Sequence, residues 1–139
     1  MKERTLAIIK PDAVAEKNAG NIIRMIEESG LTIIAIKKLQ LTAERAGQFY
    51  AVHKGKPFYA ELVNYMTSGP IYVLALEAEN AIRRWRDLMG ATNPAEAADN
   101  TIRKLYGKSI SYNASHGSDA PETARVEVAF FFDEGEFVR

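Results

Sequence analysis

Segments typical of strands and of helices alternate along the chain, and this alternation restricts the possible folds more than any other feature of the sequence. Four runs rich in branched and aromatic residues predict strands, at residues 5–9, 31–39, 71–76 and 125–132. Segments with helical spacing of apolar residues or with helix-capping signals lie between them. This order predicts an α+β fold, a ferredoxin-like two-layer sandwich in which helices pack on a four-stranded antiparallel sheet.

The helices are predicted from apolar stripes and from residues that start or end a helix. A stripe at residues 22–26 ends at Gly30, and Ile82, Trp85 and Met89 form another stripe. Asp12, after Pro11, is expected to cap a helix. Further helical segments are predicted at residues 42–50, 57–66, 93–96 and 101–106. A polar loop is expected at residues 107–121, before the last strand.

The bulk composition excludes several kinds of site. The chain has 139 residues, which suits one domain over residues 1–139. Eighteen basic residues balance eighteen acidic ones, so no overall basic field would hold nucleic acid. Cysteine is absent, which excludes disulfides, zinc thiolate sites and thiol nucleophiles. The apolar run after Arg4 is far too short for a signal peptide or a membrane span, so we expect no membrane association and a cytoplasmic location.

His116 is the candidate catalytic histidine, whereas His53 is expected to be structural. His116 lies in the polar loop at residues 107–121, and long loops in compact domains often carry function. Gly117 beside it would let a bulky ligand approach the imidazole. A single loop histidine is nonetheless more often structural, so its position alone does not decide its role.

The motif around His116 resembles a known family. Asn113-x-x-His116-Gly117-Ser118-Asp119 is similar to the active-site signature of the nucleoside diphosphate kinases. The resemblance covers nearly the whole chain, through Lys10-Pro11-Asp12, His53-Lys54-Gly55-Lys56-Pro57-Phe58, Gly90-Ala91-Thr92-Asn93-Pro94 and Thr101-Ile102-Arg103. It implies a phosphotransferase of broad nucleotide specificity. The terminal phosphate of a nucleoside triphosphate, typically ATP, would pass reversibly to a nucleoside diphosphate through a phosphohistidine at His116.

The resemblance implies a role for each residue beside the nucleophile. His116 would attack through Nδ1, a task that suits a neutral imidazole. Glu127 would accept a hydrogen bond from the other ring nitrogen, and Ser118 would orient Glu127. In a strand at residues 125–132, alternation places Glu127 opposite the face formed by Val126, Val128, Phe130 and Phe132. Without the motif, Glu127 would be interpreted as a surface charge.

Phosphoryl transfer needs positive charge around the phosphate oxygens. Lys10, Arg86 and Arg103 match the family's cationic clamp, and Lys10 is also expected to act in catalysis. Helical geometry places Arg86 about 40° from the apolar stripe of its helix, at the edge of a buried face. Thr92 and Tyr50 match hydroxyl-bearing residues near the phosphates, although Tyr50 also fits a place in the core.

The base and ribose contacts follow from the same resemblance. Phe58 matches the aromatic residue on which the base stacks, and Ile110 matches the aliphatic residue on its other side. Leu62, one helical turn after Phe58, would continue that wall, although both residues fit the core equally well. Because every base has a π-face, such a clamp would accept purines and pyrimidines. Asn113 and Lys10 match contacts to the ribose hydroxyls.

Two Gly-rich phosphate-binding motifs, Gly-x-x-x-x-Gly-Lys-Ser/Thr and Gly-x-Gly-x-x-Gly, do not occur in the sequence. Phosphate binding would therefore depend on side chains. No carboxylate cluster suggests a metal site built by the protein, so Mg²⁺ is expected to be bound mainly through the nucleotide phosphates. The family also implies a homo-oligomer, either a tetramer or a hexamer.

Other classes of function remain open at this stage. A non-catalytic nucleotide-binding regulatory module on the same fold would bind nucleotides without forming acid-labile phosphate on the protein. A nucleic-acid-binding protein could use the sheet face and Phe58, but the zero net charge argues against it. A histidine phosphocarrier acting between proteins would leave the nucleotide clamp unused.

Overall fold

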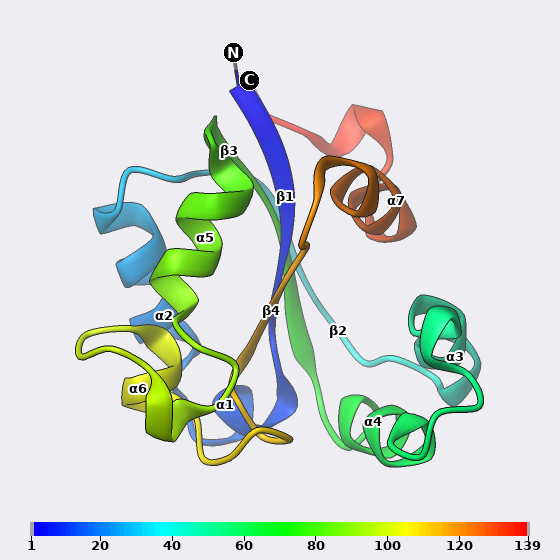
Figure 1. The fold of residues 1–139 in the computed structure, drawn as a ribbon. Coiled ribbons are helices and arrows are strands. Elements are labelled where there is room, and N and C mark those ends of the chain that lie inside the picture. The colour runs from blue at the N-terminus through cyan, green and yellow to red at the C-terminus, as the bar shows by residue number, and fades with distance from the viewer. Residues whose placement is uncertain (1, 139) are drawn as a thin grey trace.

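A four-stranded antiparallel sheet forms the centre of the molecule (Figure 1). The computed structural model describes residues 2–138, so Met1 and Arg139, the ends of the predicted domain, lie outside the described residues. The strands are β1 (Lys2–Ile9), β2 (Thr32–Leu39), β3 (Ile71–Glu79) and β4 (Ser115–Gly117), in the order β2-β3-β1-β4. Strand β1 pairs with β3 and β4, and β2 pairs with β3, all antiparallel. The predicted ferredoxin-like order is confirmed.

Helices cover both faces of the sheet (Figure 1). One face carries α1 (Pro11–Ala15), α2 (Ala19–Glu28), α5 (Ala81–Met89) and α6 (Ile102–Tyr106). The other face carries α3 (Ala43–Phe49), α4 (Tyr59–Met66) and α7 (Pro121–Phe131). Short 3₁₀ turns occupy Ala51–His53, Pro94–Glu96 and Glu134–Glu136. Among the described residues, every helix is too short or too polar to cross a membrane.

Strand β1 is buried on both sides from Leu6 to Ile9, which explains why these four residues are all apolar. Leu6 and Ile8 pack in the cluster beneath α3, α4 and α7. Ala7 and Ile9 point to the opposite cluster, beneath α2 and α5. This alternation follows from strand geometry, in which successive side chains lie on opposite faces. Packing on both faces therefore fixes the end of β1 at Ile9, and with it the point from which the following residues start.

The predicted strand at residues 125–132 is wrong, because these residues belong to α7. The fourth strand is β4, inside the segment that was predicted to be a loop. Alternation of apolar residues from Val126 onward imitates a strand, yet Val126 itself is 70% exposed. The buried residues are Ala124, Val128 and Phe131, whose spacing is helical. Pro121 in the first turn is a helix-start signal that this interpretation overlooked.

Two local expectations also need correction. Asp12 does not cap α1, because Lys10 occupies the N-cap position and Asp12 lies in the first turn. Strict alternation would place Ile34 and Ile36 on one face of the strand predicted at residues 31–39, but Ile34 is buried and Ile36 is 44% exposed. A register shift between Ile33 and Ala35 explains the difference, since a bulge inverts the alternation of the residues after it.

Candidate active site

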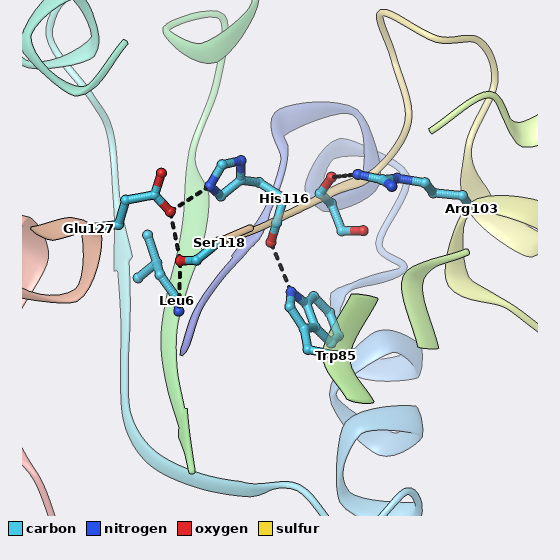
Figure 2. A network of polar contacts seen from close by, with 7 residues as sticks. Leu6, Trp85, Arg103, His116, Ser118 and Glu127 are labelled. Atoms are coloured by element: carbon cyan, nitrogen blue, oxygen red, sulfur yellow. Dashed lines mark hydrogen bonds and ion pairs between the residues drawn. The ribbon is translucent and has the colours of Figure 1, made fainter. Parts of the chain in front are cut away.

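His116 lies at the centre of β4, opposite Ile8 of β1. Its Nε2 contacts Glu127 Oε1 at 2.9 Å, and Ser118 Oγ donates to the same oxygen at 2.7 Å (Figure 2). The backbone N–H of Leu6 donates to Ser118 Oγ at 3.3 Å. The chain of bonds therefore runs from the rigid strand β1 to the imidazole. Because Nε2 faces the carboxylate, Nδ1 is the ring nitrogen left for chemistry.

The helix α7 presents Glu127 to the sheet, so the residue reaches His116 for a different reason than predicted. Glu127 is three residues after Ala124 and four before Phe131, both of which are buried. Residues at this spacing share one face of a helix. Glu127 is thus on the inner face of α7.

The backbone of β4 is held from the opposite side of the sheet. Trp85 Nε1 donates to the carbonyl oxygen of His116 at 3.0 Å, and Arg103 Nη2 donates to that of Ser115 at 3.0 Å (Figure 2). A Cβ on Gly117 would lie 2.6 Å from Trp85 Cδ1 and from Met89 Cε. The expectation that Gly117 makes room for a ligand is therefore wrong, because the position of the missing side chain points toward α5 and not toward a ligand. Glycine is required here for the close packing of β4 on α5.

Two aromatic rings border the imidazole. Phe49 meets His116 edge to face at a centroid distance of 5.6 Å, and Tyr50 does so at 6.4 Å. Phe49 also packs on Phe130 of α7 at a centroid distance of 5.3 Å, and so contacts both His116 and the helix that carries Glu127. The Tyr50 hydroxyl is buried without a hydrogen-bond partner among the described residues. Burial, together with the charge of Glu127, raises the pKa of Tyr50, so the hydroxyl remains a donor at neutral pH.

A cavity of about 650 Å³ opens in front of His116. Every predicted nucleotide-binding residue except Arg86 lines it, namely Lys10, Tyr50, Phe58, Leu62, Thr92, Arg103, Ile110 and Asn113. A slightly larger hollow of about 700 Å³ lies between the start of β1 and α7. That hollow does not include His116, so the chemistry is assigned to the smaller cavity.

The inner end of the cavity is cationic. Lys10 is buried, and its Nζ donates to Asn113 Oδ1 at 2.8 Å. Asn113 in turn donates to the carbonyl oxygen of Thr92 at 3.1 Å. Burial, with repulsion from Arg103, lowers the pKa of Lys10 to about 8. Burial, with repulsion from Arg86, lowers the pKa of Arg103 to about 10. Crowded cations of this kind are stabilised when an anion binds between them.

Arg86 does not line the cavity. It is exposed and borders an adjoining recess of about 480 Å³ that shares Thr92 and Arg103 with the cavity. Arg86 and Arg103 both line this recess, and the charge of Arg86 lowers the pKa of Arg103. Arg86 therefore lies beside the cationic end rather than in its wall.

The outer end of the cavity is apolar and open. Phe58 and Ile110 are 47% and 59% exposed, which is unusual for large apolar side chains. Phe58 immediately precedes α4, and Leu62 follows one turn later. The cavity walls thus change from cationic at Lys10 to apolar at Phe58, as a ligand with a charged end and an aromatic end requires.

Several cavity residues were not identified from the sequence, namely His53, Glu61, Tyr65, Ser111 and Tyr112. Tyr65 follows Leu62 at helical spacing, so the pattern on α4 could have included it. His53 was interpreted as structural, yet its ring lies 5.3 Å from that of Phe58 at the cavity. Nothing in the sequence distinguishes Glu61 from other surface carboxylates.

The site offers no carboxylate-rich metal centre. Within residues 2–138, no group of three or more His, Cys, Asp or Glu side chains is arranged to hold a metal ion. Glu61 is the carboxylate that lines the cavity, at the apolar end.

Comparison with known proteins gives a consistent result. A sequence profile described as nucleoside diphosphate kinase matches residues 3–137. The chain is 57% identical to the nucleoside diphosphate kinase of Bradyrhizobium diazoefficiens over 136 residues, 98% of this chain and 97% of that protein. It is 59% identical to that of Syntrophotalea carbinolica over 130 residues, 94% of this chain and 95% of that protein.

Solved structures agree. The Aquifex aeolicus nucleoside diphosphate kinase superposes with a TM-score of 0.95 at 45% identity, covering 99% of this chain and 100% of that one. The Halobacterium salinarum nucleoside diphosphate kinase in complex with CDP has a TM-score of 0.95 at 39% identity, covering 100% of this chain and 93% of that one. The chain therefore belongs to the nucleoside diphosphate kinase family and has the phosphotransferase activity of that family, as the motif around His116 predicted.

Proposed function

We propose that His116 carries the phosphate covalently between two nucleotides. The Nδ1 lone pair attacks the terminal phosphorus of a nucleoside triphosphate, the bond to the bridging oxygen breaks, and the diphosphate leaves with the bonding electrons. A second nucleoside diphosphate then attacks the phosphorus and releases Nδ1. The observation that carries this proposal is the bond from Nε2 to Glu127 at 2.9 Å, which directs Nδ1 toward the chemistry.

Glu127 and Ser118 would stabilise the phosphorylated ring. As the N–P bond forms, the imidazole gains positive charge, and the carboxylate at Nε2 offsets it. Ser118 Oγ donates to the same carboxylate oxygen at 2.7 Å and so limits its rotation. Trp85 and Arg103 hold the backbone of β4, which supports the geometry of the nucleophile.

The cationic end of the cavity would bind the phosphates. Lys10 uses one N–H on Asn113, and its remaining N–H donors are available to a ligand. Arg103 supplies charge beside it, Tyr50 supplies a buried hydroxyl without a partner among residues 2–138, and Thr92 lines the same wall. Arg86 would contribute from the adjoining recess. We also expect Asn113 and Lys10 to contact the ribose hydroxyls.

Mg²⁺ would enter bound to the nucleotide phosphates, as part of the substrate. The phosphate end of the cavity presents cations and hydroxyls, which suit phosphate oxygens rather than a bare metal ion. When bound, the ion would neutralise charge between neighbouring phosphates.

Base recognition would be broad. Phe58 and Ile110 offer two apolar surfaces at the open end, with Leu62 continuing the wall. Stacking between such surfaces accepts every base because it does not read hydrogen-bonding edges. The Halobacterium salinarum relative was solved with CDP, which supports the binding of a pyrimidine nucleotide at this kind of site. ATP would be the usual donor.

Two further properties are proposed for this chain. The chain would assemble as a homo-oligomer, a tetramer or a hexamer, which light scattering after size-exclusion chromatography would distinguish. It would act in the cytoplasm, where nucleoside triphosphates are produced and consumed.

The direct test is to incubate the protein with γ-labelled ATP and Mg²⁺ and then add unlabelled GDP, for wild type and His116→Ala. Acid-labile, alkali-stable label on the wild type alone, transferred into GTP, is the expected result. If the wild type binds ATP but remains unlabelled, the covalent mechanism fails, and a non-catalytic nucleotide-binding module takes its place.

A further inference from the structure

Lys10 occupies an unusual environment for a lysine. Its side chain is buried, its Nζ is held by Asn113, and Arg103 repels it. A buried ammonium tends to lose its proton, because desolvation disfavours the charged form. Asp12 acts in the opposite direction, because its negative charge raises the pKa of Lys10.

Asp12 is fixed by a contact from a distant helix. The hydroxyl of Tyr65, on α4, donates to Asp12 Oδ1. Asp12 Oδ2 is buried and has no hydrogen-bond partner among residues 2–138. Burial and the neighbouring carboxylate raise the pKa of Tyr65, so its hydroxyl remains a donor at neutral pH. The carboxylate therefore has one fixed oxygen and one unpaired oxygen.

Tyr65 also contacts the cavity directly. Lys10 Nζ lies 5.8 Å from the centroid of the Tyr65 ring, and the ring packs edge to face on Tyr112 at 4.7 Å. Tyr65 and Tyr112 both line the cavity, and Tyr112 immediately precedes Asn113. One side chain of α4 thus touches the carboxylate, the ammonium and the segment that holds the ammonium.

We propose that Asp12 and Tyr65 are positioning residues for Lys10: the Tyr65 hydroxyl fixes the Asp12 carboxylate so that the buried ammonium stays charged and directed into the cavity. This inference rests on the proposed function only in assigning Lys10 to the phosphates. The charge state of Lys10 is a property of the free protein. It can be measured without turnover.

The groups around Lys10 determine whether removing the charge of Asp12 raises or lowers the pKa of Lys10. Asp12 opposes burial and Arg103, so removing its charge moves the pKa of Lys10 below about 8. The contribution of Asp12 to this pKa is smaller than those of burial and of Arg103. Other titratable groups share the cavity, namely Tyr50, His53, Glu61, Tyr112 and His116. Because these groups also respond to pH, the measurement must report on Lys10 itself.

The experiment is a ¹³C NMR titration of the Lys10 ε-carbon between pH 6 and pH 11, with the signal assigned by Lys10→Arg. The variants are Asp12→Asn, Tyr65→Phe and Glu16→Gln. Glu16 is the matched control, because it follows α1 directly and pairs with exposed Lys108. Tyr65→Phe keeps the ring against Lys10 and removes only the hydroxyl. Single-turnover phosphorylation of His116 by labelled ATP is measured over the same pH range.

We expect Asp12→Asn to lower the midpoint of the Lys10 titration by a resolvable fraction of a pH unit, because Asp12 raises this pKa. Tyr65→Phe should lower it less, and Glu16→Gln should leave it unchanged. The alkaline fall in phosphorylation rate should move with the midpoint, and the rates should converge with wild type near pH 6. If Asp12→Asn folds and titrates as wild type does, the inference is overturned. If Asp12→Asn does not fold, Tyr65→Phe decides, and an unchanged midpoint there overturns it.

Failure of the proposed function would look different. A wild type that never forms phosphohistidine, with the titration shifts present, would refute the covalent mechanism while leaving the charge relation of Asp12 and Lys10 intact. Normal phosphohistidine formation without the shifts would refute this inference alone.

Discussion

The hydrogen bond between His116 and Glu127 allows a quantitative test of the catalytic geometry. Glu127 Oε1 contacts His116 Nε2 at 2.9 Å, and both side chains are largely buried. The carboxylate stabilises the imidazole more strongly as the ring becomes positive. Removing the carboxylate should therefore destabilise the transition state more than the ground state and slow the reaction. Hydrogen bonds to charged groups contribute about 1.5–3 kcal/mol. At about 1.4 kcal/mol per factor of ten, Glu127→Ala should slow phosphorylation roughly 10- to 150-fold.

The assay is rapid-quench measurement of His116 labelling from γ-labelled ATP under single-turnover conditions, which removes product release from the observed rate. ATP affinity should change little, because Glu127 does not line the cavity. Glu127→Gln, which keeps an acceptor oxygen, should lose less. Glu122→Ala is the control, since Glu122 is exposed in the first turn of the same helix. A Glu127→Ala rate within about threefold of wild type, less than about 0.7 kcal/mol, would refute the reasoning.

Further predictions concern packing, base stacking and pH. Gly117→Ala should lower the free energy of unfolding by about 1–3 kcal/mol in urea titration, because its Cβ would collide with Trp85 and Met89; an unchanged midpoint would contradict the required close packing. Phe58→Ala should raise KM by similar factors, roughly 5- to 150-fold, for ADP, GDP and CDP, and a loss confined to one base would argue against stacking. The folded pKa of Lys10, about 8, is below its ordinary value of 10.5, so the unfolded chain binds more protons between these values and stability rises with pH there. Between pH 7 and pH 11, the free energy of unfolding of the wild type should rise by about 3 kcal/mol more than that of Lys10→Met. Urea titrations that show no such difference would mean that Lys10 titrates normally.

Elements with one unambiguous periodicity were predictable from the sequence. The stripe of Ile82, Trp85 and Met89 is the buried face of α5, and Thr42 caps α3 by accepting from the Arg45 backbone N–H. Residues 125–132 were not predictable in this way, because their apolar residues fit both alternation and helical spacing. Strand β4 carries no apolar pattern in its three residues. It is a strand because its backbone pairs with β1, a partner that lies more than a hundred residues earlier.

The composition of the site was largely predictable, and its geometry was not. The motif around His116 identified the nucleophile candidate, and most predicted nucleotide-binding residues do line one cavity. The exclusion of Arg86 from its wall could not be foreseen, because a helical wheel locates a side chain only relative to its own helix. Trp85 as the support of the His116 backbone was likewise hidden, since the two residues lie on different elements.

The sequence by itself determined the fold class and the family, because periodicity and a contiguous motif are local properties of a chain. The tertiary structure alone decided which groups meet. Lys10 and Asn113 are 103 positions apart, and Tyr65 lies 53 positions from Asp12. Such contacts depend on how strands pair and how helices pack on both faces of the sheet. The electrostatics of the site follow from the same packing, because the pKa of Lys10 is lowered by burial and by Arg103, neither of which is a property of its neighbours in sequence.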